Sequence, residues 1–221
     1  AGNVHFDQVK ALSEKWFGPI GSPEPPERRL PKETPQDLKR TLEVRADVPA
    51  SALYKAYHMP GRFHKDFFAI DLMGDVLARG QSSRFYQKLV KEKEVFTSIS
   101  AFTMGSIDPG LFVVNGRVRN GVSLRDAEKE LNDIIFDFVA KGPTDEEVEK
   151  VKNQAYSTLE FAEVEVMNRA MNLAFAKLSG DANLVKKEAE LIEAVSSGDI
   201  GRVAREVLRE ENSSVLYYEA K

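Results

Sequence analysis

The sequence of 221 residues contains no cysteine, and this absence excludes two kinds of site. Disulfide frameworks and thiolate metal sites both require cysteine. With 42% apolar residues, a chain of this length can still bury a core that folds without covalent staples. The missing cysteines do not by themselves identify a cellular compartment.

Histidine is almost as scarce, and its spacing is wrong for a zinc site on a helix. The three histidines are His5, His58 and His64. His58 and His64 are six positions apart with a Pro-Gly pair between them, so no helix can carry both on one face. No glutamate lies between Glu43 and Glu92 to act as their general base. The sequence therefore predicts no metal ligands in this chain, and a lone histidine is better explained as an ordinary hydrogen-bonded residue.

An excess of positive charge and a long apolar run are also missing. The formal net charge of -4 and the pI near 5.6 argue against nucleic-acid binding, which depends on clustered positive charge. No apolar run approaches the ~20 residues of a membrane span, and the first residues lack the apolar core of a signal peptide. These absences predict a soluble chain that has no membrane span and does not bind nucleic acid.

Motifs for nucleophilic or phosphate chemistry are absent as well. The sequence has no G-x-S-x-G elbow, no Walker-type glycine loop and no thiol nucleophile. We therefore expect this chain to hold no catalytic residue and to be catalytically inert on its own.

Apolar periodicity predicts a mixture of helices and strands, with two-residue periods for strands and 3.6-residue periods for helices. The expected strands are 39–48, 52–58, 95–102, 110–118 and 215–219, the first two as neighbours in one sheet. The expected helices are one within 1–20, then 66–78, 83–91, 124–138, a single long helix from 144 to about 178, 184–194, and a last one capped by Ser197. Because strands and helices do not alternate strictly, the fold class is α+β: a two-layer sandwich with one mostly antiparallel sheet backed by helices.

Helix caps mark several of these elements. Ser82 and Ser83 are candidate caps for the helix at 83–91, and Ser123 for the helix that follows it. Thr144 and Glu147, in the run T-D-E-E, have the spacing of a capping box. On these grounds Phe85 lies in a buried stripe, and the basic residues of the 83–91 helix lie on its solvated face.

The order of residues in two stretches adds a resemblance. The run GQSSRFYQKLVKEKEVFTSISA resembles the G-x-SSRLY-x-x-LV-[RK]-E-K stretch, followed by a strand, in the C-terminal domains of insulinase/pitrilysin-type (inverzincin) zinc metallopeptidases. The run GPTDEEVEKVKN resembles a helix opening of the same family. Mitochondrial processing peptidase and the core proteins of the bc1 complex belong to this group. The resemblance implies the same α+β architecture.

The resemblance also implies a domain organisation. Residues 1–20 resemble the closing segment of a preceding domain. The matching stretch begins at Gly2-Asn3-Val4 and ends at Phe17-Gly18. Residues 19–35 contain six prolines, and we expect 21–38 to be an extended interdomain linker. Residues 39–221 would then form the C-terminal, inactive domain.

In this family, zinc is held by an H-x-x-E-H helix on another domain or subunit. The resemblance therefore implies a C-terminal domain that cradles the peptide substrate in an enclosed chamber, with zinc on the partner. It implies substrate contacts at Ser82, Ser83, Arg84, Tyr86, Lys91 and Thr97. Lys91 and Thr97 stand where many members carry an arginine and a tyrosine, and they supply neither a bidentate fork nor a phenol. This departure favours binding over a direct catalytic role.

Two other functions stay open at this point. One is a non-catalytic scaffold or assembly subunit like the bc1 core proteins, which the altered Lys91 and Thr97 favour. The other is an independent peptide-binding module, which requires that residues 1–20 pack against the rest of the chain. If the protein is bacterial, the resemblance implies the periplasm as its location. The sequence does not identify the substrate.

Overall fold

A computed structural model describes residues 2–22, 31, 33–105 and 107–221. The part of the predicted linker at 23–30 and 32 lies outside these residues. The chain divides into two compact units: residues 1–34 with 157–188, and residues 35–156 with 189–221. The helices are α1 (Phe6–Phe17), α2 (Phe67–Ala78), the π-helix η1 (Tyr86–Glu92), α3 (Leu124–Lys141), α4 (Asp145–Ala162), α5 (Val166–Leu178), α6 (Leu184–Glu193), α7 (Ser197–Val207) and the 3-10 turn η2 (Glu210–Asn212). The strands are β1 (Arg40–Ala46), β2 (Ala52–Met59), β3 (Phe96–Met104), β4 (Gly110–Val118) and β5 (Ser213–Ala220).

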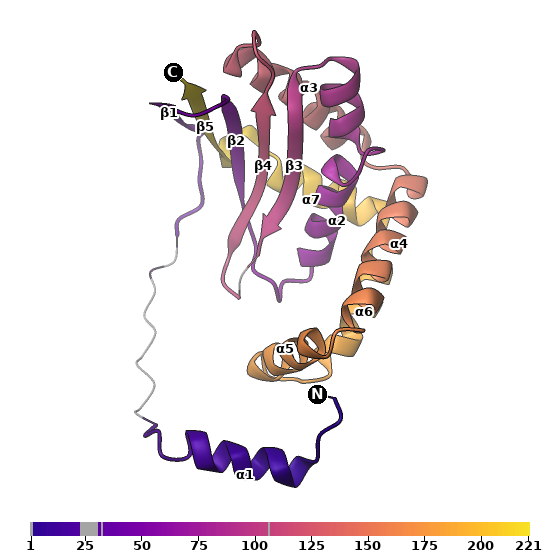
Figure 1. Cartoon of the computed structure of the whole chain (residues 1–221). Helices are drawn as coiled ribbons and strands as arrows, with labels where there is room; N and C mark the ends of the chain where they lie inside the picture. Colours follow the sequence, from indigo (N-terminus) through magenta and orange to yellow (C-terminus); the bar gives the residue numbers. More distant parts are fainter. Residues whose placement is uncertain (1, 23–30, 32, 106) are drawn as a thin grey trace. The chain divides into compact units, whose positions relative to one another are not determined.

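The second unit is built on one five-stranded sheet with the strand order β1-β5-β2-β4-β3. Only the β1–β5 pair is parallel, and the other three pairs are antiparallel. Helices α2, α3 and α7 cover one face of this sheet (Figure 1). The predicted α+β fold, with one mostly antiparallel sheet backed by helices, is confirmed.

The core lies between the sheet and these helices because alternate strand residues turn toward them. In β2, Leu53, Tyr57 and Met59 are buried on this side, and Phe112 and Val114 of β4 join them. Almost every apolar side chain of α2 is buried as well. The predicted helix at 66–78 therefore packs as a core helix.

One strand adjacency was wrong. The sequence predicts β1 and β2 as neighbours, but β5 lies between them. Its end is held there by bonds from the Lys221 amide to the Ala46 carbonyl (3.0 Å) and from the Ala220 amide to the Ser51 hydroxyl (3.0 Å). Two strand spacings amount to about 10 Å, which the short connection from Ala46 to Ala52 bridges easily.

The single long helix expected from 144 to 178 was also wrong. Helix α4 ends at Ala162, the backbone of Glu165 is extended, and α5 begins at Val166. Neither glycine nor proline marks this break, so the sequence carries no ordinary stop signal there. The last helix is capped by Ser196, one residue before the expected Ser197, in a reciprocal capping box with Asp199.

Of the remaining predicted caps, those at Ser123 and Thr144 are confirmed and the one at Ser82 or Ser83 is not. The Asp126 amide donates to the Ser123 hydroxyl (3.0 Å), and Thr144 and Glu147 exchange bonds between backbone and side chain (2.8 and 3.2 Å). The Ser83 hydroxyl instead donates back to the Gly80 carbonyl (2.7 Å), and η1 has no side-chain cap bond. The helix there is of the π type, because the Lys93 amide bonds the carbonyl five residues earlier (3.0 Å).

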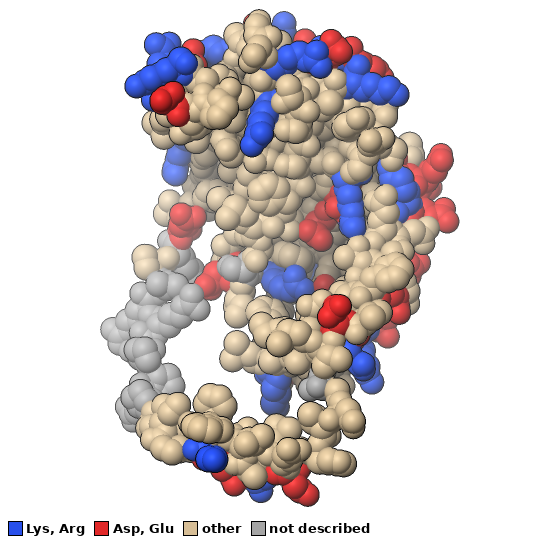
Figure 2. Space-filling view, viewed as in Figure 1, with Lys and Arg blue, Asp and Glu red and all other residues tan. Residues whose placement is uncertain are grey.

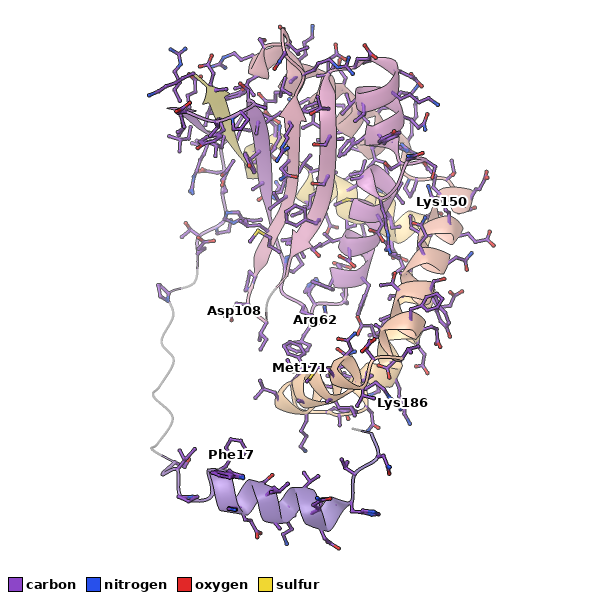
Figure 3. All side chains as sticks on the ribbon, in the orientation of Figure 1. Phe17, Arg62, Asp108, Lys150, Met171 and Lys186 are labelled. Atoms are coloured by element: carbon purple, nitrogen blue, oxygen red, sulfur yellow. The ribbon has the colours of Figure 1, made fainter. Side chains whose placement is uncertain are left out.

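The first unit contains α1 and α5, two helices with exposed apolar side chains. The predicted helix within residues 1–20 is present as α1, and none of its residues is buried. Phe17 of α1 is 69% exposed and Met171 of α5 is 63% exposed, and both project from their helices (Figure 3). Across the described residues, no helix combines the length and the apolar character that a membrane span requires.

A fully buried lysine joins the sheet to the helical layer. The Lys55 ammonium donates to Asn132 (2.8 Å) and Glu210 (2.7 Å), and lies 3.3 Å from the Glu128 carboxylate. Lys39 binds the same two glutamates at 2.6 and 2.8 Å. Two ammonium groups therefore face two carboxylates, and the buried Lys55 and Glu128 are compensated by each other and by the partly exposed Lys39 and Glu210.

The pKa values in this cluster follow from its geometry. Burial alone raises the pKa of Glu128, but hydrogen bonds from Lys39 and Tyr217 and the charge of Lys55 outweigh burial and hold that pKa below its ordinary value. Burial, together with donation to Glu128, raises the pKa of Tyr217 to about 12. The folded state therefore favours the ionised carboxylate and the neutral phenol.

We predict that Lys55→Met lowers the free energy of unfolding by about 3–5 kcal/mol, because it removes the fully buried ammonium group and leaves Lys39 to compensate both the Glu128 and the Glu210 carboxylates. Urea denaturation measures this loss. The control is Lys88→Met, which removes an exposed i,i+4 pair with Glu92 and should cost less than about 1 kcal/mol. Equal losses for the two variants would show that the buried lysine does not hold the layers together.

We also predict a pH dependence that isolates Glu128. A carboxyl whose folded pKa is lowered contributes stability above its ordinary pKa of 4.5, and this stability is lost as the pH falls through the folded pKa. The difference in unfolding free energy between the natural chain and Glu128→Gln should therefore be largest near pH 7 and should shrink below about pH 4.5. Denaturation curves between pH 7 and pH 3 test this. A constant difference across that range would contradict it.

Candidate functional site

The face of the sheet opposite α2, α3 and α7 is largely open, and it carries apolar and aromatic side chains. It is formed by the even-numbered residues of β1, β2 and β5, the odd-numbered residues of β4, and the even-numbered residues of β3 from Ser98 onward. We call this surface the open face. Leu42 is 60% exposed on it, Met104 57%, Phe102 42% and Tyr54 38%. Over β2, β4 and β3 its surface is mostly uncharged (Figure 2).

This arrangement shows where the apolar side of β1 lies. The sequence predicts a half-buried strand with Leu42 and Val44 on its apolar side, but that side faces away from the helices. The other side carries Glu43, which pairs with Arg125 of α3. The alternating pattern therefore located the strand, and Val44 and Ala46 on its apolar side are half-buried, whereas Thr41, Glu43 and Arg45 on the other side are exposed.

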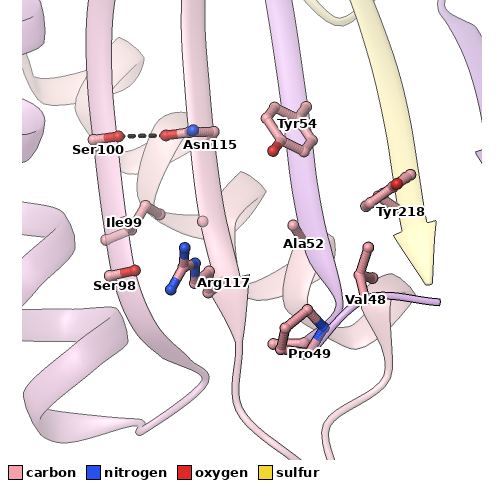
Figure 4. Close-up of a pocket in the computed structure, with 12 residues that line it drawn as sticks. Val48, Pro49, Ala52, Tyr54, Ser98, Ile99, Ser100, Asn115, Arg117 and Tyr218 are labelled. Atoms are coloured by element: carbon pink, nitrogen blue, oxygen red, sulfur yellow. Dashed lines mark hydrogen bonds between the residues drawn. The ribbon is translucent and has the colours of Figure 1, made fainter. Parts of the chain in front are cut away.

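A cleft of about 510 Å³ lies on the open face. Tyr54 of β2 and Tyr218 of β5 line one side of it, and Ser98 and Ser100 of β3 line the other, with Arg117 of β4 between them (Figure 4). The Ser100 hydroxyl donates to the Asn115 side chain within the cleft (Figure 4). The cleft therefore offers aromatic faces, hydroxyls, an amide and one cation.

Arg117 is the only charged residue among those that line this cleft. Its side chain is exposed and projects toward Ser98 and Ile99 of the neighbouring strand (Figure 4). Its carbonyl oxygen accepts a bond from the Thr97 hydroxyl (3.2 Å), but its guanidinium forms no hydrogen bond or ion pair with another described residue. The five N–H donors of this group are therefore available to a ligand.

A second cleft, of about 300 Å³, shares Tyr54 with the first and continues toward the other edge of the sheet. Leu42 and Leu216 contribute apolar surface to it, and Arg40 of β1 contributes a cation. The Arg40 guanidinium also has no hydrogen-bond or ion-pair partner among the described residues. The two clefts thus form a continuous surface with an arginine in each.

The structure separates the six predicted contact residues into two groups. Ser83 and Arg84 have their polar groups engaged within the fold, and Tyr86 is half-buried. Ser82, Lys91 and Thr97 are exposed. Ser82 accepts a bond from the Lys150 ammonium of α4 (3.2 Å), and Thr97 lies at a register shift between β3 and β4. None of the six lines the two clefts, and their role in substrate binding stays a prediction.

Arg84 does not lie on a solvated face, as the helical pattern predicts. Its guanidinium binds the Glu147 carboxylate through two nitrogens (2.8 and 2.7 Å) and donates to the Gly142 carbonyl (2.9 Å). The group also lies over the Phe138 ring, 4.8 Å from its centroid. Burial alone raises the pKa of Glu147, but hydrogen bonds from Arg84 and Thr144 outweigh burial and lower that pKa. Arg84 therefore holds the start of α4 against the end of α3.

The residues present do not fit a zinc site. In the described part of the chain, no group of three or more His, Asp or Glu side chains is placed to hold a metal ion. His58 lies in β2, and the His64 ring accepts a bond from the Asp66 amide (3.2 Å) just before α2. The Asp66 carboxylate in turn binds Arg202 of α7 (2.5 Å), which ties that loop to the helical layer.

Sequence reasoning missed Arg117, Arg40, Tyr54 and Tyr218. The signal that could have found them is the alternation within each strand, since all four share the strand parity of the open face. Alternation shows which residues of a strand share a side, but it does not show which side the helices cover. The sequence therefore could not distinguish these four residues from ordinary solvent-exposed strand residues.

Comparison with known proteins identifies the relatives of this chain. Residues 1–155 match the family described as the peptidase M16 inactive domain. A zinc protease named PqqE from Helicobacter pylori is 27% identical over 156 residues, which are 68% of this chain and 35% of that protein. The chain thus spans about a third of the length of this curated relative.

Solved structures share the fold. A protease from Helicobacter pylori superposes with a TM-score of 0.90 at 21% identity, covering 98% of this chain and 53% of that one. A chain of complex III2 from Candida albicans superposes with a TM-score of 0.80 at 14% identity, covering 96% of this chain and 52% of that one. The resemblance that the sequence predicts is confirmed by the family match.

We predict that Arg84→Lys lowers the free energy of unfolding by about 1–2 kcal/mol, because lysine keeps the charge but loses the fork that binds Glu147 and the Gly142 carbonyl together. Chemical denaturation measures the change. Arg119→Lys is the matched control, since Arg119 makes only an exposed pair with Glu94. A loss as small as that of the control would show that Arg84 has no structural role.

Proposed function

The chain belongs to the peptidase M16 family as an inactive domain, and from this we propose that it forms one wall of a chamber that encloses an unfolded peptide. Zinc and its H-x-x-E-H helix would lie on another domain or subunit. The observation that carries the proposal is the open face, an uncovered sheet surface with exposed apolar and aromatic side chains. Such a surface gives a peptide apolar contact without requiring a catalytic group on this chain.

Two features of the open face support contact with an extended peptide. Its clefts run across strands from β3 to β1 and meet at Tyr54, so they accommodate a chain segment better than a compact ligand. At one side, β3 pairs only with β4 and is an edge strand. Edge strands can pair with an extended peptide through their backbone, a mode that depends little on side-chain identity.

We further propose the domain organisation that the sequence indicates. Residues 1–20 would close a preceding domain, 21–38 would link it, and 39–221 would form the substrate-cradling domain. Within the last, Ser82, Tyr86, Lys91 and Thr97 would contact the peptide from the segment that leads into β3. Ser83 and Arg84 would position that segment through their bonds to Gly80 and Glu147.

A second function, a non-catalytic scaffold subunit, has its own support. The fold is shared with a chain of complex III2, and Lys91 and Thr97 lack the chemistry of the arginine and tyrosine found in many peptidase members. In this case no zinc-bearing partner would exist, and the open face would bind a structural neighbour.

The two functions are separated by a peptidase assay with and without a zinc chelator. We expect the 221-residue chain alone to cleave no peptide, because its described residues include no group of side chains placed to hold zinc. The complete protein, or the chain with its H-x-x-E-H partner, should cleave unfolded peptides and lose that activity in the chelator. Re-addition of zinc should restore it.

Two outcomes would contradict the proposal. Cleavage by the isolated chain that survives purification to homogeneity would mean that it carries an active site of its own. A complete assembly that binds no zinc and cleaves nothing would support the scaffold function instead.

A further inference from the structure

We propose that the open face selects peptide segments that carry acidic side chains, with Arg117 and Arg40 as the residues that bind them. This inference rests on the proposed function and names the class of substrate. The ligand is an extended peptide with apolar or aromatic residues between two carboxylates.

The charge of the open face favours an acidic ligand. None of the strand residues whose side chains lie on this face is Asp or Glu, although the chain has more acidic than basic residues and a formal net charge of -4. Two arginines do lie on it, Arg40 and Arg117. The open face of this acidic protein therefore carries arginines and no strand carboxylate. A positively charged face is complementary to an anionic ligand.

The two arginines of the open face differ from several others in this unit, which have carboxylate partners: Arg45 binds Glu219, Arg84 binds Glu147, and Arg202 binds Asp66. Arg205 makes no ion pair within the described residues either, but it belongs to α7 in the helical layer. The guanidinium groups of Arg40 and Arg117 make no hydrogen bond or ion pair within the described residues. A guanidinium fork matches a carboxylate through two parallel bonds, so each arginine can hold one acidic side chain.

The surroundings of Arg117 favour a peptide carboxylate over a free ion. The cleft that contains it also presents Tyr54, Tyr218 and the apolar side chains of Val48 and Pro49. An inorganic anion would leave these surfaces in water, whereas a peptide buries them while its acidic side chain reaches the arginine. Ser98 and Asn115 are available to bond the peptide backbone.

Strand geometry sets the spacing of the two acidic residues. Arg117 is in register with Ala52, Ala52 with Tyr218, and Tyr218 with Val44, which is four residues beyond Arg40. Three strand spacings amount to about 14 Å and four residues along a strand to about 13 Å, so the two Cα atoms are about 20 Å apart. An extended chain covers that distance in about six residues.

The test is binding of labelled peptides to the 221-residue chain, measured by fluorescence anisotropy. The peptide has blocked ends, glutamates at both ends six positions apart, and between them five residues chosen from Leu, Phe, Ser and Gly. A matched peptide has glutamine in place of both glutamates. We expect the glutamate peptide to bind about three- to tenfold more tightly for each carboxylate engaged, and high salt to remove this difference.

Protein variants locate the effect. Arg117→Gln and Arg40→Gln should each weaken binding of the glutamate peptide about three- to tenfold and leave the glutamine peptide unchanged. Lys129→Gln is the control, because it removes one exposed positive charge from α3, on the opposite side of the sheet. Circular dichroism confirms that the variants fold, which is expected since neither arginine has an internal partner.

Each remaining outcome overturns the inference. Equal binding of the two peptides, with no effect of either arginine variant, would refute acid selection while leaving the proposed chamber wall intact. No binding of any peptide would refute it too, and the chelator assay would then decide the proposed function separately. If an oligonucleotide competes as well as the glutamate peptide does, the ligand of the open face is a nucleic acid. If the chain forms a dimer that Arg117→Gln dissociates, the ligand is a second copy of the chain.

Discussion

Within the unit formed by residues 35–156 and 189–221, the described helices cover one face of the five-stranded sheet and not the other, and this constraint determines the roles of the strand residues. A β-strand directs successive side chains to opposite faces, so each strand contributes both to the core and to the open face. In β2, Leu53 and Tyr57 are buried beneath the helices while Tyr54 lies in the clefts on the other side. A shift of register by one residue would exchange these roles, and the packing of the helical layer therefore also fixes which residues a ligand meets.

The buried lysine cluster contributes to that register. Lys55 lies on the helix side of β2, and its bonds to Asn132 of α3 and Glu210 of η2 require the strand to stay in one position relative to both elements. Tyr217 of β5 donates to Glu128 of the same cluster. An apolar contact tolerates some sliding, whereas an ammonium group with several fixed acceptors does not, since a displaced buried charge loses its compensation. The cluster thus links β2 and β5 to α3 and η2, and the open face depends on the positions of these elements.

Most of the elements could be predicted from the sequence because their signals are local. The alternation in β4, the spacing of apolar residues in α3 and the Thr144–Glu147 capping box each occur within a few residues. The insertion of β5 between β1 and β2 could not be predicted, because it depends on pairing across more than 160 positions, as between Tyr218 and Val44. The open face could not be identified for the same reason. Which side of a strand the helices cover is decided by tertiary packing, and Leu42 is apolar on the side that they leave exposed.

The recognised stretch from Gly80 to Ala101 shows why a family resemblance predicts fold more directly than chemistry. Its residues that match the family pattern include Ser83, Arg84 and Leu89, and all three are used inside the fold: a bond to Gly80, a bridge to Glu147 and a place in the core. Lys91 and Thr97, which depart from the chemistry of many peptidase members, are exposed. Exposed positions can change without loss of folding free energy, whereas buried and bonded ones cannot. The stretch therefore identifies an architecture, and the ligand preference of this chain has to be sought in side chains such as Arg117, which lie outside it and have no structural partner.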